Sequence, residues 1–132
     1  MQILGLHWAD GNAAKVSAFG KALSAAQHAD GGWSQNPNLP SDAYATGETL
    51  YALKEAGVLS VSGAVYQKGV KFLMDTQSAD GSWYVRSRVP KFQPYFQSGF
   101  PYDHDQWISS TATSWAVRAL VPAVADEKRA SR

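Results

Sequence analysis

The chain has 132 residues, of which 45% are apolar and 12% aromatic, so it can bury the core of one domain and is not predicted to be disordered. Its formal net charge is +1 and its charged residues are scattered, which excludes the basic stripe of a nucleic-acid-binding protein. The absence of cysteine excludes disulfides, CxxC redox pairs, cysteine-ligated zinc and CxxCH haem attachment.

The chain begins without a targeting signal that we can recognise. Residues 1–6 lack the basic flank and the long apolar stretch of a secretory signal. No apolar run approaches the ~20 residues that a membrane-spanning helix needs, so no membrane span is predicted, and no compartment is indicated. We interpret residues 4–8, Leu-Gly-Leu-His-Trp, as the exposed end of an earlier structural element.

Two amphipathic helices are predicted next. In residues 16–26, Val16, Phe19, Leu23 and Ala26 recur with the 3.6-residue rhythm of a helix, and the same rhythm returns in residues 65–74. Each helix is followed by a similar segment, Gln-His-Ala-Asp-Gly-Gly-Trp at residues 27–33 and Gln-Ser-Ala-Asp-Gly-Ser-Trp at residues 77–83. The segments are identical at five of seven positions, fifty residues apart, which predicts an internal repeat.

The Asp-Gly step in each segment is expected to end the preceding helix, because glycine readily adopts the positive φ of a helix cap or turn. A second helix then follows each segment. In the first unit Ser41 and Asp42 suit the N-cap of a helix that ends at Gly57. In the second unit the helix is predicted from about residue 106 to residue 121, and Pro122 marks its end.

The helix at residues 106–121 is predicted to have two sides. Its core stripe consists of Trp107, Ile108, Thr111, Ala112, Trp115, Ala116, Ala119 and Leu120. Its other side, which is small enough to let another helix approach closely, consists of Ser109, Ser110, Thr113 and Ser114. The repeating unit is therefore helix, Gln-x3-Gly-x-Trp turn, helix, with almost no strand.

This unit resembles the QW repeat of squalene–hopene and oxidosqualene cyclases, which also occurs in protein prenyltransferase β subunits. The second copy matches through Lys68-Gly69, Phe72-Leu73-Met74, Gln77, Gly81 and Trp83, and the first, looser copy through Gly20-Lys21, Leu23 and Gln27. The resemblance covers roughly residues 12–121. It implies an α/α-toroid, in which outer and inner helices alternate around a ring of about six pairs.

The predicted fold is all-α: a single domain, residues 1–132, with QW-type repeats at about 12–57 and 62–121 and a long aromatic loop. Two helix pairs make only about a third of such a ring, and a repeat that buries its face against neighbours needs more neighbours or caps. We therefore expect either that the segment belongs to a longer parent chain or that copies of it associate.

The repeated turn has a structural role in these families, which the chemistry of its residues explains. A glutamine amide both donates and accepts, so it can join one helix end to the start of the next, and a tryptophan covers that junction. We assign this role to Gln27, Gly31, Trp33, Gln77, Gly81 and Trp83, with ligand contact as the alternative.

The candidates for catalysis are Asp103 and Asp105. The resemblance to cyclases implies a D-x-D-D motif, whose clustered carboxylates keep one aspartate protonated. The nearest match here, Asp-His-Asp-Gln at residues 103–106, lacks the last acid. In the alternative interpretation, Asp105 is the N-cap of the following helix in a solvated loop.

No metal or other cofactor is predicted. The zinc site of the prenyltransferases includes a cysteine, which this chain lacks, and its three histidines are far apart in the sequence. Residues 27–33 also resemble a segment of α/α-toroid pectate lyases, which implies calcium-binding carboxylates and a catalytic arginine. Arg86, Arg88 and Arg118 are present, but no acidic cluster accompanies them.

The loop of about 28 residues at 78–105 is long for a compact domain, and such loops tend to be functional. Its rings either fold back over their own domain, line an apolar ligand pocket, or meet a partner protein. The candidate binding surface comprises Tyr84, Arg86, Arg88, Phe92, Tyr95, Phe96, Phe100, Tyr102 and, beyond the loop, Trp107.

Three functions follow from these observations. The first is a non-catalytic helical-repeat segment of a larger, squalene-cyclase-like protein that serves architecture or partner binding. The second is a terpenoid-cyclase-like or isoprenoid-binding module with its catalytic residues elsewhere, since aromatic faces stabilise carbocations as they do other cations. The third is a polysaccharide lyase fragment.

Overall fold

The computed structural model describes residues 2–9, 12–90 and 96–130. These form five α-helices, α1 (Gln2–Trp8), α2 (Ala13–Ala25), α3 (Ala43–Glu55), α4 (Ala64–Asp75) and α5 (Gln106–Ala130), and a 3-10 turn, η1 (Asp103–Asp105). The described residues contain no strand, so the predicted all-α class is confirmed. None of the described helices combines the length and the apolarity needed to cross a membrane.

Local sequence accounts for where the helices begin and end. The Asn12 and Asp42 side chains cap α2 and α3 by accepting hydrogen bonds from the Ala14 and Ala45 amides, both at 2.8 Å. The predicted capping by Asp42 is thus confirmed. Glycines with positive φ follow α2, α3 and α4: Gly31 at +87°, Gly57 at +69° and Gly81 at +85°.

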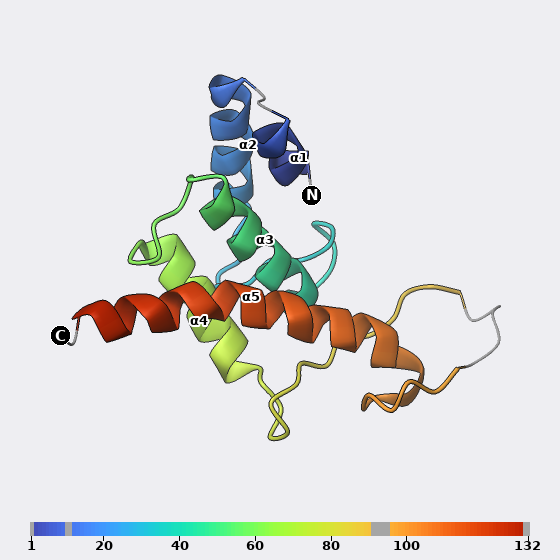
Figure 1. Ribbon diagram of the computed structural model, residues 1–132. Helices are drawn as coiled ribbons and strands as arrows, with labels where there is room; N and C mark the ends of the chain where they lie inside the picture. The colour runs from blue at the N-terminus through green and yellow to red at the C-terminus, as the bar shows by residue number, and fades with distance from the viewer. Residues whose placement is uncertain (1, 10–11, 91–95, 131–132) are drawn as a thin grey trace.

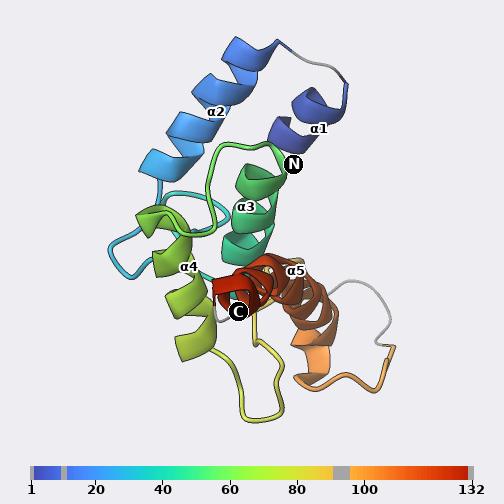
Figure 2. The same ribbon diagram turned by 60° about the vertical axis from the view of Figure 1, so that its left-hand side comes forward.

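Helix α3 is the centre of the fold. It lies between the α1–α2 pair and the α4–α5 pair (Figures 1 and 2). Seven of its 13 residues are buried, including Leu50 and Leu53, and its largest helix–helix contact is with α5. The core is therefore built around α3, and the other helices are placed by how they cover it.

Helices α3 and α5 cross at Gly47. A Cβ atom at this position would lie 2.6 Å from the Ala116 backbone nitrogen, so only glycine lets the two backbones come this close. On the α5 side the contact is made by small residues, and Ala112, Ala116 and Ala119 are fully buried. The crossing depends on the lack of side-chain volume on both helices.

The sequence predicts that this helix ends at Pro122, but α5 continues to Ala130. Proline removes one donor from the helix, and the carbonyl that loses its partner belongs to Arg118. Arg118 is exposed, so water can satisfy that carbonyl. The buried Tyr66 of α4 also holds this part of α5, since its hydroxyl donates to Ala119 O at 2.5 Å. Burial raises the pKa of Tyr66 to about 12.

The predicted two sides of α5 are only partly correct. Ala112, Ala116 and Ala119 face the core as predicted, but Trp107 and Thr111, which were assigned to the same stripe, are exposed. Ser109, assigned to the other side, is fully buried because the loop backbone covers it: its hydroxyl accepts from Val85 N at 3.0 Å and donates to Val85 O at 3.2 Å.

The interpretation of residues 4–8 as an exposed end is also wrong in part. They belong to α1, which packs against α2 and α3 and buries Ile3 and Leu4 almost completely. Trp8, at the end of α1, is exposed. The period of a helix cannot be seen in so few residues, so the pattern did not reveal which side is buried.

Replacing Gly47 by alanine is expected to destabilise the protein by about 2 kcal/mol. Alanine favours a helix by up to about 1 kcal/mol, but the added methyl group must push α3 away from the α5 backbone. Urea unfolding followed by circular dichroism measures the change. Gly5→Ala is the matched control, because nothing lies within 4 Å of a Cβ atom there, and it should leave stability unchanged or slightly raised. Equal effects of the two substitutions would show that the helices do not cross so closely.

Candidate functional site

The two repeated segments, residues 27–33 (the first turn) and residues 77–83 (the second turn), have the same internal hydrogen bonds. The Gln27 amide donates to Gly31 O and the Gln77 amide to Gly81 O, both at 2.9 Å. Asp30 accepts from the Gly32 amide at 2.9 Å, and Asp80 accepts from the Ser82 amide at 3.0 Å. The sequence repeat is therefore also a repeat of backbone geometry.

The tryptophan of each turn closes the end of the preceding helix. The indole of Trp33 donates to Leu23 O at 2.7 Å, and that of Trp83 donates to Leu73 O at 2.8 Å. These carbonyls belong to the last turns of α2 and α4, where each also accepts a long hydrogen bond from the C-cap amide, Ala26 N at 3.2 Å and Thr76 N at 3.3 Å. Both tryptophans are buried, so each indole covers the helix end and satisfies one of its carbonyls.

A threonine that the sequence analysis did not single out joins each turn to the following helix. The Trp33 amide donates to Thr46 Oγ1 at 2.9 Å, and the Trp83 amide donates to Thr113 Oγ1 at 3.0 Å. The threonine follows the tryptophan by 13 residues in the first repeat and by 30 in the second. The longer connection between Trp83 and Thr113 concealed this equivalence in the sequence. The only sign of it was that a threonine is present in each helix that follows a turn.

The first turn, unlike the second, is covered by the next repeat. The Gln27 amide also donates to Val65 O of α4 at 2.8 Å, and a Cβ atom at Gly31 would lie 2.5 Å from Lys68 O. In the second turn Gln77 and Gly81 are exposed. The nearest atom to a Cβ at Gly81 would be the Gln77 amide of the same turn, at 3.9 Å.

Helices α3 and α5, which follow the first and the second turn, differ in the same way. Thr46 and Thr113 occupy equivalent positions, so Leu50 of α3 corresponds to Val117 of α5. Leu50 is 0% exposed and its side chain lies against Gly69 of α4, whereas Val117 is 47% exposed.

The position in α5 that corresponds to Gly47 of α3 is Ser114, which is also exposed. We call Gln77, Gly81, Ser114 and Val117 the uncovered positions of the second repeat, because their counterparts in the first repeat are covered by α4 or α5.

The two candidate acids lie in η1, and Asp105 connects the long loop to the start of α5. Its carboxylate accepts from the Ser87 amide at 2.9 Å and from the Tyr84 hydroxyl at 2.8 Å. The hydrogen bond to Asp105 is the main reason why the pKa of Tyr84 is raised. Asp105 was predicted to cap α5, but its carboxylate binds the loop instead. Asp103 is exposed and has a φ of +48°.

The rings of the candidate binding surface are only partly brought together. Tyr84 and Tyr102 meet edge to face at 5.3 Å, and Phe100 lies 6.3 Å from Tyr102. The Tyr102 hydroxyl is hydrogen-bonded to the Ser78 and Ser82 hydroxyls, at 2.7 and 2.6 Å. This group of rings therefore covers the side of the second turn that faces the loop.

The other predicted surface residues are dispersed. Arg88 pairs with Asp42 at 3.4 Å, which links the loop to the N-terminus of α3. Arg86 and Phe96 are exposed, and Trp107 is exposed on α5. Phe92 and Tyr95 lie outside the described residues.

Gln106, the first residue of α5, is a buried organiser of the loop that the sequence did not reveal. Its side-chain oxygen accepts from the Ser98 amide at 2.6 Å and from the Ser98 hydroxyl, and its amide donates to Phe96 O at 3.2 Å. A glutamine at a helix start is usually exposed, so the sequence contained no signal for this role.

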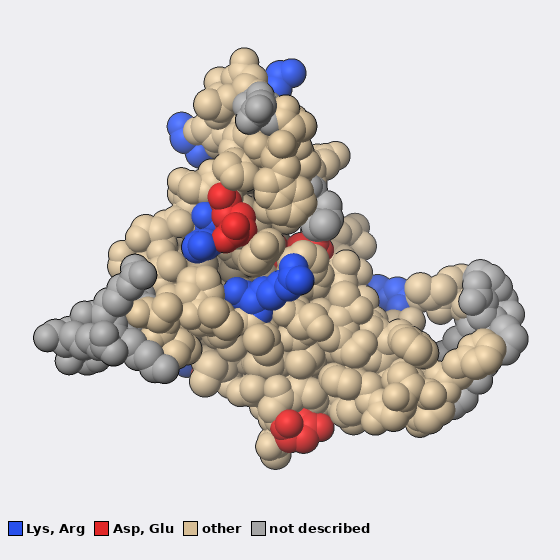
Figure 3. All heavy atoms as spheres, viewed as in Figure 1, with Lys and Arg blue, Asp and Glu red and all other residues tan. Residues whose placement is uncertain are grey.

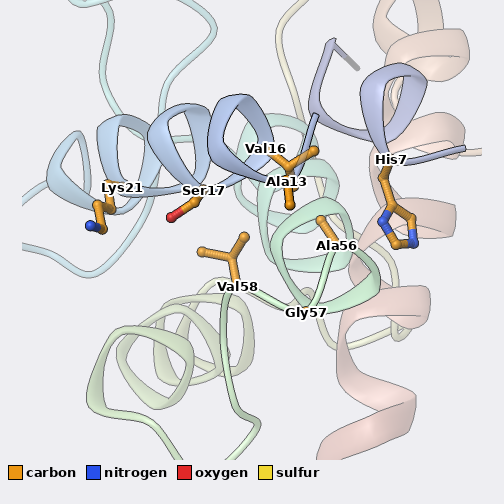
Figure 4. A pocket seen from close by; sticks show the side chains of 8 residues that line it. All are labelled: His7, Ala13, Val16, Ser17, Lys21, Ala56, Gly57 and Val58. Carbon is orange, nitrogen blue, oxygen red and sulfur yellow. The ribbon is translucent and has the colours of Figure 1, made fainter. Parts of the chain in front are cut away.

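The described part of the chain offers several pockets, and one of about 330 Å³ between α1, α2 and α3 has Gln35, Tyr44 and Glu48 in its lining. A pocket of about 600 Å³ lies between α2 and the end of α3, where Val16, Ala56 and Val58 separate His7 from Lys21 at its two ends (Figure 4). A smaller pocket of about 230 Å³ is lined by Phe72, Trp83 and Arg88. No three His, Asp or Glu side chains among the described residues could hold a metal ion together.

No family model matches this chain, and no curated protein or solved structure matches it either. The toroid resemblance therefore stays a prediction from the two turns.

Matched substitutions of the two glutamines test whether the first turn is docked on α4. Gln27→Ala removes a local hydrogen bond and the bond to Val65 O, whereas Gln77→Ala removes only the local one. We expect a loss of about 2 kcal/mol for Gln27→Ala and of at most about 1 kcal/mol for Gln77→Ala in chemical unfolding. If both variants lost the same stability, the bond between the repeats would contribute nothing in solution.

The two glycines provide an independent comparison. Gly31→Ala and Gly81→Ala each place alanine at a positive φ, which costs about 1 kcal/mol in either turn. Only Gly31→Ala also forces a methyl group against Lys68 O, so it should lose about 2 kcal/mol more. Thermal unfolding curves measure the difference. Loss of stability in Gly81→Ala as large as in Gly31→Ala would show that the second turn is covered too.

Proposed function

We propose that this chain is a non-catalytic helical-repeat module, similar to a segment of a squalene-cyclase-like toroid, which has a structural role and binds a further helical element beside its second repeat. The observation that carries this proposal is the contrast between Leu50, which is fully buried, and its counterpart Val117, which is about half exposed. The second turn adds to it, because Gln77 lacks the contact with a following helix that Gln27 makes.

The physical reason is that a helical repeat buries its faces against its neighbours. Each Å² of apolar surface left in water forgoes about 25 cal/mol, and an end repeat normally carries polar residues where no neighbour follows. Here Val117 and Ser114 offer no charge to water at the uncovered positions. Val117 is thus apolar at a position where an end repeat would ordinarily carry a polar side chain.

The chemistry of Asp105 favours this proposal over a cyclase. Protonation of an alkene needs a carboxyl group that is free to face the substrate. Both carboxylate oxygens of Asp105 are already used, because they accept from the Ser87 amide and the Tyr84 hydroxyl. Its carboxylate is therefore used to hold the loop against the start of α5.

The aromatic loop also favours a structural role over isoprenoid binding. The hydroxyl of Tyr102 is fixed by two serines beside the second turn, and the Tyr84 hydroxyl is fixed by Asp105. The smaller pocket near Trp83 and Tyr84, at about 230 Å³, lies below the usual range of about 300–1,000 Å³ for ligand sites. The rings of Tyr84, Phe100 and Tyr102 thus pack against one another beside the second turn.

An isoprenoid assay separates the proposed function from its alternative. The protein is incubated with squalene in detergent micelles, products are analysed by gas chromatography, and the melting temperature is followed against squalene concentration. We expect no cyclised product, no shift in melting temperature, and a stability loss of about 1–2 kcal/mol for Asp105→Asn, because asparagine keeps only one of the two acceptor oxygens. Asp75→Asn, at an exposed ion pair with Lys71, is the control. Product formation that Asp105→Asn abolishes would overturn the proposal, as would a saturable rise in melting temperature.

A further inference from the structure

The outward side of α5 carries a seam of uncharged residues with the spacing of a coiled coil. The residues are spaced alternately by three and four positions, which is the pattern of a heptad core. They are Trp107, Ser110, Ser114, Val117, Val121 and Val124, which we call the α5 seam.

Five of the six seam residues are exposed to solvent, and Ser110 is half-buried. Trp107 is 57% exposed, Val121 is 60% exposed and Val124 is 50% exposed. The seam lies on the side of α5 opposite Ala112, Ala116 and Ala119, which face α3. Within one chain α5 therefore packs through its alanine side and leaves the seam uncovered. In Figure 3 the surface over α5 is largely uncharged, with one group of Lys or Arg atoms near its middle.

The seam is complementary to itself when two copies of α5 run in opposite directions. If the centre of the pair lies between residues 115 and 116, Ser114 of one copy faces Val117 of the other. Ser110 then faces Val121, and Trp107 faces Val124. Small serines lie opposite branched valines near the centre, which is the alternation of volumes that lets two helices interdigitate.

Charge and shape at the centre of the seam favour the same pairing. Between residues 107 and 124 the only charged side chain is Arg118. Its guanidinium is held over the rings of Tyr51 and Trp115, 5.7 and 5.4 Å from their centroids. In an antiparallel pair its nearest flanking residue in the second copy is Thr111, so no like charge lies directly opposite it. Ser114 occupies the position that in α3 is Gly47, where α3 and α5 approach closely.

We propose that a second copy of this chain covers the second repeat by packing its α5 antiparallel against the α5 seam, about a two-fold axis. Such an interface uses the same patch on both copies and closes after two chains. The inference rests on the proposed function, because it names the helical element that the second repeat binds. A further repeat in another chain could cover the same positions. It would give no reason, however, for the serines and valines of the seam to face one another in an antiparallel pair of identical helices.

The mass in solution tests the proposal. Light scattering and sedimentation equilibrium on the full chain, from about 1 µM to about 500 µM, should show a monomer–dimer equilibrium with no larger species. Val117→Glu places two carboxylates beside the two-fold axis and should weaken dimerisation at least tenfold. Val89→Glu, the same change at an exposed loop position, is the matched control and should dimerise like the unmodified chain.

Val121→Glu gives a second measurement along the seam, and circular dichroism at low concentration checks that each variant is folded. A chain that stays monomeric over the whole range overturns the proposal. A dimer that survives both Val117→Glu and Val121→Glu also overturns it, because another surface must then hold the copies together.

Cross-linking tests the direction of pairing, and the chain has no cysteine that would interfere. Ser110→Cys and Val121→Cys chains are mixed and oxidised. We expect a disulfide between the two variants and none within either variant alone, because identical residues lie 11 positions, or about 16 Å, out of register in the antiparallel pair. Disulfides within each variant alone would indicate a parallel pair and overturn the proposal.

These outcomes are independent of the squalene assay. A monomer that neither converts nor binds squalene would reject self-pairing and leave the proposed function standing, with the helical element in another chain. Squalene turnover would reject the proposed function whatever the mass in solution.

Discussion

Closing a helix end with a buried indole is the interaction on which the rest of the structure depends. A helix that stops leaves its last carbonyls short of helix donors, and here a tryptophan six residues after the glutamine returns to give one of them a short hydrogen bond. The same tryptophan donates its backbone amide to a threonine of the next helix. One residue thus fixes both where the first helix ends and where the second helix lies. Trp33 does this for α2 and α3, and Trp83 for α4 and α5.

The positive φ of the turn glycine belongs to this local geometry and not to docking. Gly31 and Gly81 have nearly the same φ, although only Gly31 lies against α4. A glycine in the motif therefore does not show that a neighbour covers it. The difference lies in the surroundings, because Gln27 finds a carbonyl of α4 and Gln77 finds only its own turn. Two turns with the same backbone thus show what the presence of a following repeat changes.

Features that depend on neighbours in sequence could be predicted, and features that depend on neighbours in space could not. The all-α class, the cap at Asp42 and the repeated turns follow from local spacing and from the conformational preferences of glycine and aspartate. The burial of Gln106 depends on where the loop returns, which the sequence pattern does not encode. The continuation of α5 past Pro122 likewise depends on tertiary contacts such as that of Tyr66. The sequence predicted that Asp105 directly precedes the last helix, but it did not predict the hydrogen bonds of Asp105 with Ser87 and Tyr84.

Helix α5 has different surroundings on each side, and these account for the different residue types that each side carries. One side packs on α3 through alanines, and a second binds loop backbone through Ser109 and Thr113. A helix side that faces only water ordinarily carries charged residues, because apolar side chains there would stay in water without a packing partner. The remaining side of α5 instead carries serine, valine and Trp107 at heptad spacing. The described contacts within one chain account for the first two sides of α5, and the proposed pairing with a second copy would account for the third.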